Sequence, residues 1–326
     1  MVEDNADLVP AGQAGLDTPR LDYDGVIQHF LSGLKPNTLR TYDQAFTDFV
    51  SFLSRREGRK VTRQDAAHLL LAHGHGQANI TAHDYLVDMQ GRGLSASSIN
   101  NRLSAIRKLV AVARVRGLVP WSLEIRNVPS EPYRDTRGPG TNAVQLLLSQ
   151  VAGSRPRDVR DRAIIRLLFD LSLRRGEVVT LDVEDVELER KAIHVLRKGK
   201  TEKKLLDLPP QTVKTLSDWL QVRGEEAGPL FINFDRAGKG ERLSGTSLYR
   251  NLKKLGARIG VTVSPHQLRH TGITTASVKA AQAGYRQRDL AQYSGHKSST
   301  TLDYYIDATE NLQGKIADMV ASTVEG

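Results

Sequence analysis

The sequence predicts a mainly α-helical protein with one small antiparallel β-sheet, built as two domains. Apolar residues recur at helical spacing from about Asp22 to Leu123. Three short strand-like segments follow one another between 183 and 208. A stretch rich in proline and glycine, residues 125–140, separates the two patterns and indicates irregular backbone. We therefore expect a helical first domain, a linker and a mixed second domain.

The first domain is expected to span residues 21–124, after a flexible tail at 1–20 that lacks periodicity. Asn37 or Thr38 can cap a helix whose core positions are spaced by three, four and one: Leu39, Tyr42, Phe46, Phe49, Val50 and Leu53. Two further helices are predicted at 61–71 and 81–91, with a glycine-rich loop between them that carries His73 and His75.

The last helix of this domain begins near Ser97 or Ser98 and stops near Gly117. One face carries Ile99, Leu103, Ile106, Val110 and Ala113. Basic residues lie largely off that face, as a surface for a polyanion requires: Arg102, Lys108 and Arg114.

The linker, 125–140, contains arginines that would suit a segment lying against phosphates, among them Arg134 and Arg137. The second domain is expected at 141–310. Its predicted strands are 183–188, 192–196 and 203–208, with Gly199 turning the last hairpin. Its helices include a segment ending at Leu173 and then 211–223, 247–259, 266–281, 287–294 and 301 onward.

Composition narrows the functional classes. The chain has 326 residues, a formal net charge of +9 and a pI near 9.7, which favours polyanionic partners such as DNA. It has no cysteine, so disulfides and thiolate metal sites are excluded. No apolar run is long enough for a membrane span, and the acidic N-terminus is not a secretory signal. A cytoplasmic, nucleoid-associated protein is expected.

Six polar residues in the last half of the chain supply what metal-free cleavage of a DNA strand requires. Such a site needs cations for the phosphate, a proton donor for the leaving oxygen and a nucleophile that holds the cut end. The candidates are Arg174, Lys198, His266, Arg269, His296 and Tyr305.

The two arginines suit this task because a planar guanidinium binds two phosphate oxygens in fixed geometry. His266 and Arg269 are three residues apart, so on a helix they share one face, and Pro265 suits the first turn. Taken alone, Arg174 also fits an ordinary surface arginine at a helix corner. His270 is expected to point away from the shared face as a structural histidine.

Lys198 lies beside a predicted turn, where a flexible lysine can protonate a departing oxygen. With Lys200 close by, the run also fits a solvated basic hairpin. Tyr304 and Tyr305 are adjacent, so on a helix they point about 100° apart and only one can face the cations. His73, His75 and His83 fit no common metal-ligand spacing, and no metal or other cofactor is expected.

These motifs resemble those of the tyrosine recombinases, the phage-integrase and Xer-type family. Residues 171–177, Leu-Ser-Leu-Arg-Arg-Gly-Glu, match the first-arginine motif, with Ser172 where glycine is usual. Residues 266–271 match the H-x-L-R-H box, Gly295-His296 matches the second histidine, and 300–305 match the nucleophile segment. The resemblance runs from about residue 22 to 307, and it selects Lys198 as the hairpin lysine.

The resemblance implies a SAM-like core-binding domain and a catalytic domain that close as a C-shaped clamp around duplex DNA. Tyrosine would attack the phosphate, giving a 3′-phosphotyrosine and a free 5′-hydroxyl, without ATP or metal. Arg174 and Arg269 would hold the phosphate, and Lys198 would be the general acid. His266 would manage the nucleophile's proton, His296 would bind the phosphate, and the site would be oriented by Glu177.

Two features depart from the family pattern. The interval from Arg269 to His296 is 27 residues, a few more than usual, and the extra length is expected within 279–287 as a longer loop. Thr301 favours Tyr304 as the nucleophile. The nine-residue step from His296 and the ending Tyr305-Ile306-Asp307 favour Tyr305, which we prefer.

The implied partner is double-stranded DNA with inverted-repeat core sites. A tail at 311–326, with an apolar stripe at Ile316, Met319 and Val320, would dock on a neighbouring protomer, or else fold back on its own domain. The active form would then be a homotetramer, with monomers or dimers when free. Two alternatives remain open: relaxation of DNA as by a type IB topoisomerase, and DNA binding without catalysis.

Overall fold

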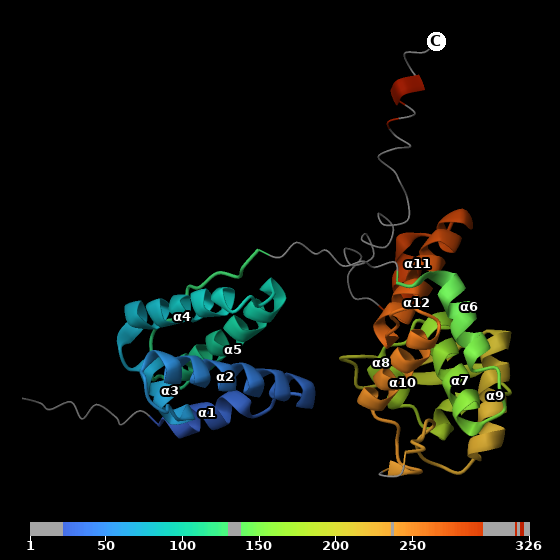
Figure 1. The fold of residues 1–326 in the computed structure, drawn as a ribbon, viewed down its shortest axis with the longest axis horizontal. Coiled ribbons are helices and arrows are strands. Elements are labelled where there is room, and N and C mark those ends of the chain that lie inside the picture. Colours follow the sequence, from blue (N-terminus) through green and yellow to red (C-terminus); the bar gives the residue numbers. More distant parts are fainter. Residues whose placement is uncertain (1–21, 130–137, 236–237, 296–316, 318–319, 323–326) are drawn as a thin grey trace, which may run out of the picture. The chain divides into compact units, whose positions relative to one another are not determined.

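The computed structural model describes residues 22–129, 138–235, 238–295, 317 and 320–322 (Figure 1). The chain divides into two compact units, Met1–Pro132 and Tyr133–Gly326. Helices predominate in both, and the sheet lies in the second. The predicted fold class, mainly helical with a small antiparallel sheet, is confirmed. Among the described residues, no helix combines the length and apolar composition needed to cross a bilayer.

Within residues 22–129 the structure consists of helices packed around one apolar core, listed in chain order: α1 Tyr23–Leu31, α2 Pro36–Arg56, α3 Arg63–Leu71, α4 Gly74–Gly91 and α5 Ala96–Val115. The predicted stripe of α2 is buried at Phe46, Phe49 and Leu53, whereas Leu39 is 37% exposed. The rings of Phe49 and Tyr85 meet edge to face at 5.1 Å, which joins α2 to α4.

The predicted helix caps differ from the observed ones. Helix α2 begins at Pro36, so neither Asn37 nor Thr38 caps it. Proline suits the first helical position because its missing N–H needs no partner there. Helix α5 begins at Ala96, and its cap is Ser95, whose side chain accepts the Ser98 N–H at 3.3 Å. The helix therefore begins one residue before Ser97, close to the predicted start, with serine as its cap.

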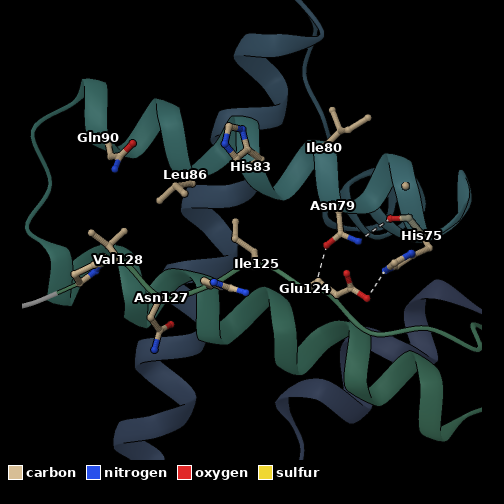
Figure 2. A pocket seen from close by; sticks show the side chains of 13 residues that line it. His75, Asn79, Ile80, His83, Leu86, Gln90, Glu124, Ile125, Asn127 and Val128 are labelled. Atoms are coloured by element: carbon tan, nitrogen blue, oxygen red, sulfur yellow. Dashed lines mark hydrogen bonds and ion pairs between the residues drawn. The ribbon is translucent and has the colours of Figure 1, made fainter.

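The glycine-rich loop predicted around His75 is wrong, because α4 already begins at Gly74. Figure 2 shows the contacts that stabilise this end of the helix. The Asn79 side chain accepts the backbone N–H of Glu124 at 2.9 Å and donates to the His75 carbonyl at 3.0 Å. His75 Nε2 also lies 3.5 Å from a Glu124 carboxylate oxygen. These tertiary contacts outweigh the low helix propensity of the glycines.

The second unit contains the sheet and the remaining helices, in this order: α6 Gly140–Gln150, α7 Pro156–Asp170, α8 Arg175–Val179, the 3₁₀ turn η1 Val183–Asp185, β1 Val186–Glu187, β2 Ala192–Leu196, β3 Lys203–Asp207, α9 Pro210–Arg223, α10 Gly245–Arg258, α11 Pro265–Gln282 and α12 Gln287–Ser294. The strands form an antiparallel sheet in the order β1-β2-β3. Helices α9 to α12 match their predicted bounds within two residues.

Two predicted elements are shorter than expected. The predicted start of the first strand, Val183–Asp185, is a 3₁₀ turn. The Asp185 N–H donates to the Asp182 carbonyl and is not paired with a neighbouring strand. Helix α7 ends at Asp170, before Leu173, because Ser172 adopts a positive φ of 48° that a helix cannot contain. Helix α11 continues through Gln282 and α12 begins at Gln287, so the connection at 283–286 lies within the range where the extra length between Arg269 and His296 is expected.

Gly272 sets the approach of α11 to the end of α7. A Cβ at this position would clash with the Phe169 carbonyl oxygen and would lie 2.7 Å from the Ser172 hydroxyl oxygen. We expect Gly272→Ala to lower the free energy of unfolding by about 2–3 kcal/mol, because both neighbours are packed backbone or buried side chain. Calorimetry should show the lower melting temperature.

The matched control is Gly176→Ala on α8, where a Cβ meets nothing within 4 Å. That variant should be unchanged or stabilised by up to about 1 kcal/mol, since alanine favours a helix over glycine. Equal stability of the two variants would contradict the tight contact at Gly272.

Candidate active site

Four of the predicted site residues line one pocket of about 460 Å³: Arg174, Lys198, His266 and Arg269. They come from three places in the second unit: the start of α8, the β2–β3 turn and the first turns of α11. Tyr249 on α10 and Ser264 lie in the same wall. The fold therefore gathers side chains that are up to 95 residues apart in the sequence (174 to 269).

Arg174 is held at the N-terminus of α8 by Glu177. The Arg174 backbone N–H donates to Glu177 Oε2 at 2.9 Å, and the Arg174 Nη1 donates to Oε1 at 2.9 Å. Its other terminal nitrogen, Nη2, donates to the Gly295 carbonyl at 3.3 Å. The side chain is 27% exposed. Arg174 is thus oriented by a carboxylate and still reaches the pocket, unlike an ordinary surface arginine.

Glu177 is the acceptor around which this part of the site is built. Its carboxylate also accepts the Arg197 Nη1 at 3.1 Å and the backbone N–H of Lys198 at 3.2 Å. Burial alone would raise the pKa of Glu177. The backbone hydrogen bond from Arg174 and the charges of Arg197 and Arg174 outweigh burial, so the pKa lies below its usual value. The group is therefore an ionised anchor at neutral pH.

Arg269 is 2% exposed and lies on α11. Its Nη1 donates to the Ser172 carbonyl and its Nη2 to the Ser294 carbonyl, the latter at 2.6 Å. The positive φ of Ser172 turns that carbonyl toward Arg269, which is a physical reason for glycine at this position. Here the Ser172 hydroxyl donates instead to the Tyr293 hydroxyl at 3.0 Å, which compensates part of the backbone strain.

The two histidines of α11 lie together. His266 is exposed in the first helical turn, after the Ser264 cap, and it lines the pocket with Arg269 as the shared face predicted. His270 is buried, as expected. Its ring centroid is only 4.0 Å from that of His266, however, so the prediction that it points away from that face is wrong. The two histidines are four residues apart, and side chains at this spacing are neighbours on the same side of a helix.

Lys198 lies at the β2–β3 turn with an exposed side chain, next to Gly199 at a φ of 79°. Lys200 is exposed in the same turn, and its backbone N–H donates to the Arg197 carbonyl at 3.0 Å. The turn thus places one lysine at the pocket and a second beside it. Of these two lysines, Lys198 is the one that lines the pocket formed by the described residues.

Several predicted site residues lie outside the described residues: His296, Tyr304, Tyr305, Arg134 and Arg137. The predicted stripe members Ile316 and Met319 also lie outside them, whereas Val320 is described and is 63% exposed.

In the first unit the predicted DNA-binding residues differ in their surroundings. Lys108 and Arg114 are exposed on α5. Arg102 is half-buried, and its Nε donates to Asp48 Oδ2 at 3.1 Å. The pKa of Asp48 is lowered to about 2, chiefly by the hydrogen bond from Arg92, which outweighs the rise that burial alone would cause. Arg102 therefore belongs to an ionic cluster between α2 and α5, and its charge is partly neutralised there.

Sequence reasoning missed Arg197 and Tyr293. Arg197 is 8% exposed and pairs with Glu177, and Tyr293 bridges Ser172 and the Asp170 carbonyl. Strand alternation could have indicated the first, because Arg197 follows the buried Ile193 and Val195 at a period of two. In the part of the chain that the structure describes, no three His, Asp or Glu side chains gather as a metal site would need.

Comparisons with known proteins agree with this geometry. The phage integrase family matches residues 141–311, and the N-terminal SAM-like domain of phage integrases matches residues 27–117. A tyrosine recombinase of Synechocystis sp. is 32% identical over 88% of this chain and 91% of its own length. Tyrosine recombinase XerA of Pyrococcus furiosus is 28% identical, over 86% of each chain.

Solved structures show the same fold. The Tn1549 transposon integrase in complex with transposon right end DNA covers 93% of this chain and 98% of its own, with a TM-score of 0.66 and 15% identity. A lambda integrase dimer bound to a COC′ core site covers 88% and 96%, with a TM-score of 0.63 and 16% identity. From the two family matches and the relatives along nearly its whole length, the chain belongs to the phage integrase family and is a tyrosine-type site-specific DNA recombinase.

Proposed function

We propose that Arg174, Lys198, His266, Arg269 and His296 form the active site at which Tyr305 cleaves a DNA strand. The observation that supports this most is the convergence of two arginines, a lysine and a histidine on one pocket. Phosphodiester cleavage by a hydroxyl needs this set, because charge develops on the phosphate oxygens and on the leaving oxygen. A surface arginine or a solvated hairpin lysine has no reason to share such a pocket.

Each group has one role in the proposed mechanism. Arg174 and Arg269 hold the non-bridging oxygens of the phosphate, with His296 as a third donor. Tyr305 attacks the phosphorus, and His266 takes up its proton. Lys198 protonates the departing 5′ oxygen. The product is a 3′-phosphotyrosine with a free 5′-hydroxyl, and a 5′-hydroxyl of a partner strand reverses the step.

The partner is double-stranded DNA with inverted-repeat core sites, and we infer that the protein acts at the nucleoid. The net charge of +9 favours phosphate contacts, and the exposed Lys108, Arg114 and Lys200 are available for them. Arg134 and Arg137 extend this set along the linker. Because Asp48 neutralises part of its charge, Arg102 contributes less than Lys108.

The experiment for this function is covalent capture in EDTA. Sheared DNA from the source genome is mixed with the protein, the mixture is denatured, and the attached DNA is sequenced. Recovery of one recurrent sequence with the protein on a 3′ phosphate supports the mechanism and gives the target site. Ordinary DNA binding without any attached DNA would overturn it in favour of a binding-only role.

The tail at 311–326 is proposed to dock on a neighbouring protomer in a homotetramer that holds two DNA sites. Val320, the described member of its stripe, is 63% exposed, as a docking residue would be before assembly. Deleting 311–326 should abolish synapsis of two target sites in a native gel while single-site binding persists. Val320→Asp is the milder companion variant. Intact synapsis in the deletion would show that the tail does not dock in trans.

A further inference from the structure

Arg197 is a buried cation that the proposed mechanism leaves without a role. It follows strand β2 and directly precedes Lys198. Its Nη1 donates to Glu177 Oε2 at 3.1 Å and its Nη2 to the Tyr293 carbonyl at 3.4 Å. The side chain is 9% exposed, and that of Glu177 is 3% exposed. A charge in this environment is kept only by partners that fix its geometry.

The second contact joins Arg197 to the end of α12. Three consecutive carbonyls there, those of Tyr293, Ser294 and Gly295, accept from Arg197, Arg269 and Arg174 respectively. A Cβ at residue 295 would lie 3.3 Å from the Arg197 Cζ, so the backbone packs directly on the guanidinium. Cations at a helix C-terminus also interact favourably with the helix dipole.

On its other side, Arg197 is the first residue of the lysine turn. The β2–β3 ladder ends with the pair Leu196 and Lys203, so the turn projects beyond the sheet. The Lys198 N–H donates to Glu177 Oε1, the same carboxylate that binds the Arg197 guanidinium through its other oxygen. One carboxylate thus fixes the Lys198 backbone directly and through the preceding side chain.

We propose that Arg197 is a positioning residue for Lys198: by bridging Glu177 and the Tyr293 carbonyl, it holds the turn so that the lysine ammonium reaches the leaving oxygen. This inference rests on the proposed general-acid role of Lys198. Loss of the bridge leaves Lys198 chemically intact on a turn that moves, and proton delivery becomes the slow step.

The test compares two DNA substrates built on the site recovered by covalent capture. One carries the normal 5′ oxygen at the scissile phosphate, and the other carries 5′ sulfur. In both, the tyrosine oxygen forms the bond to phosphorus and the bond to the 5′ atom breaks. An alkoxide must be protonated as it leaves, whereas a thiolate, from a thiol of pKa about 8.5, leaves without a proton. The sulfur substrate therefore removes the need for Lys198.

Single-turnover cleavage is measured for wild type, Arg197→Met, Lys198→Ala and Arg190→Met. Arg190, in the β1–β2 turn and with a side chain 74% exposed, is the matched control, and its variant should cleave both substrates like wild type. We expect Arg197→Met to cleave the oxygen substrate about 10- to 100-fold more slowly, at or below the roughly 10²- to 10⁴-fold that loss of the general acid itself costs, and the sulfur substrate within about threefold of wild type. Lys198→Ala should show the same rescue.

Two results overturn different statements. If sulfur fails to rescue Lys198→Ala, the proposed general-acid role of Lys198 is wrong, whatever Arg197 does. If Lys198→Ala is rescued but Arg197→Met is equally slow on both substrates, or is as fast as wild type on oxygen, the positioning role of Arg197 is wrong. Should Arg197→Met not fold, Arg197→Lys replaces it, because an ammonium can pair with Glu177 without spanning to Tyr293. It too should be slow on oxygen and rescued by sulfur.

Discussion

The Tyr305→Phe variant is expected to form no covalent DNA complex, whereas Tyr304→Phe should form complexes at close to the wild-type level. Phenylalanine lacks the oxygen that bonds to phosphorus, and the arginines, the lysine and the histidines of the site are assigned to the phosphate and to proton transfer in the proposed step. Cleavage should fall by at least about 10³-fold, to the background of the assay, since the loss is of the bond-forming atom itself. Denaturing gels with labelled target DNA in EDTA measure it.

The control is DNA binding, which both variants should retain because neither change alters a cation. A reversed pattern, with capture by Tyr305→Phe and none by Tyr304→Phe, would move the nucleophile by one residue. Capture by both single variants would contradict the assignment of one of the two tyrosines as the sole nucleophile. This comparison tests the choice of Tyr305, which rests on its position nine residues after His296.

Glu177→Gln should have the second largest effect, because it changes both folding and catalysis. The carboxylate accepts from Arg174, Arg197 and the Lys198 N–H. A glutamine offers one acceptor oxygen and turns an NH₂ toward a guanidinium, so two buried or half-buried arginines lose their counter-charge. We expect the free energy of unfolding to fall by about 3–5 kcal/mol. Cleavage should fall by at least about 10²-fold, since Arg174 and Lys198 are both displaced.

The loss of stability should depend on pH in a defined direction. The pKa of Glu177 is lower in the folded protein, despite burial, because of the Arg174 hydrogen bond and the nearby guanidinium charges. Its contribution to stability is therefore fully present above the unfolded-state pKa and is lost as pH falls through the folded-state pKa. Urea unfolding of wild type and Glu177→Gln should differ most near neutral pH and converge in acid.

Glu189→Gln, at an exposed position in the β1–β2 turn, is the matched control and should leave the curve unchanged. A difference between wild type and Glu177→Gln that stays constant down to acid pH would mean that ionisation of Glu177 does not contribute. The proposed anchoring of Arg174 by charge would then be wrong.

The sequence predicts the parts of this structure that depend on local spacing. Amphipathic periodicity locates α2, α5 and α9 to α12, and the i, i+3 relation brings His266 and Arg269 onto one face. The family motifs select Arg174 and Lys198 from among neighbouring cations, which spacing alone does not. The gathering of these four residues in one pocket needs the fold, because they belong to three separate elements.

The misses have a common physical cause. Helix α4 begins at Gly74 because the Asn79 and Glu124 contact stabilises it, and no local propensity reports a partner 45 residues away. The positive φ of Ser172 depends on its carbonyl meeting Arg269 and its hydroxyl meeting Tyr293. In the sequence Arg197 is one more cation of a basic hairpin, and only the folded chain brings Glu177 beside it. Each depends on a tertiary partner.

The three arginines that contact the end of α12 donate to its main-chain carbonyl oxygens and not to its side chains. They therefore recognise the path of the chain and are indifferent to most of its sequence, apart from Gly295 with its φ of 64°. The backbone at the end of α12 is thus held by three cations independently of most of its side chains, and the segment that would carry the proposed nucleophile starts from that held position.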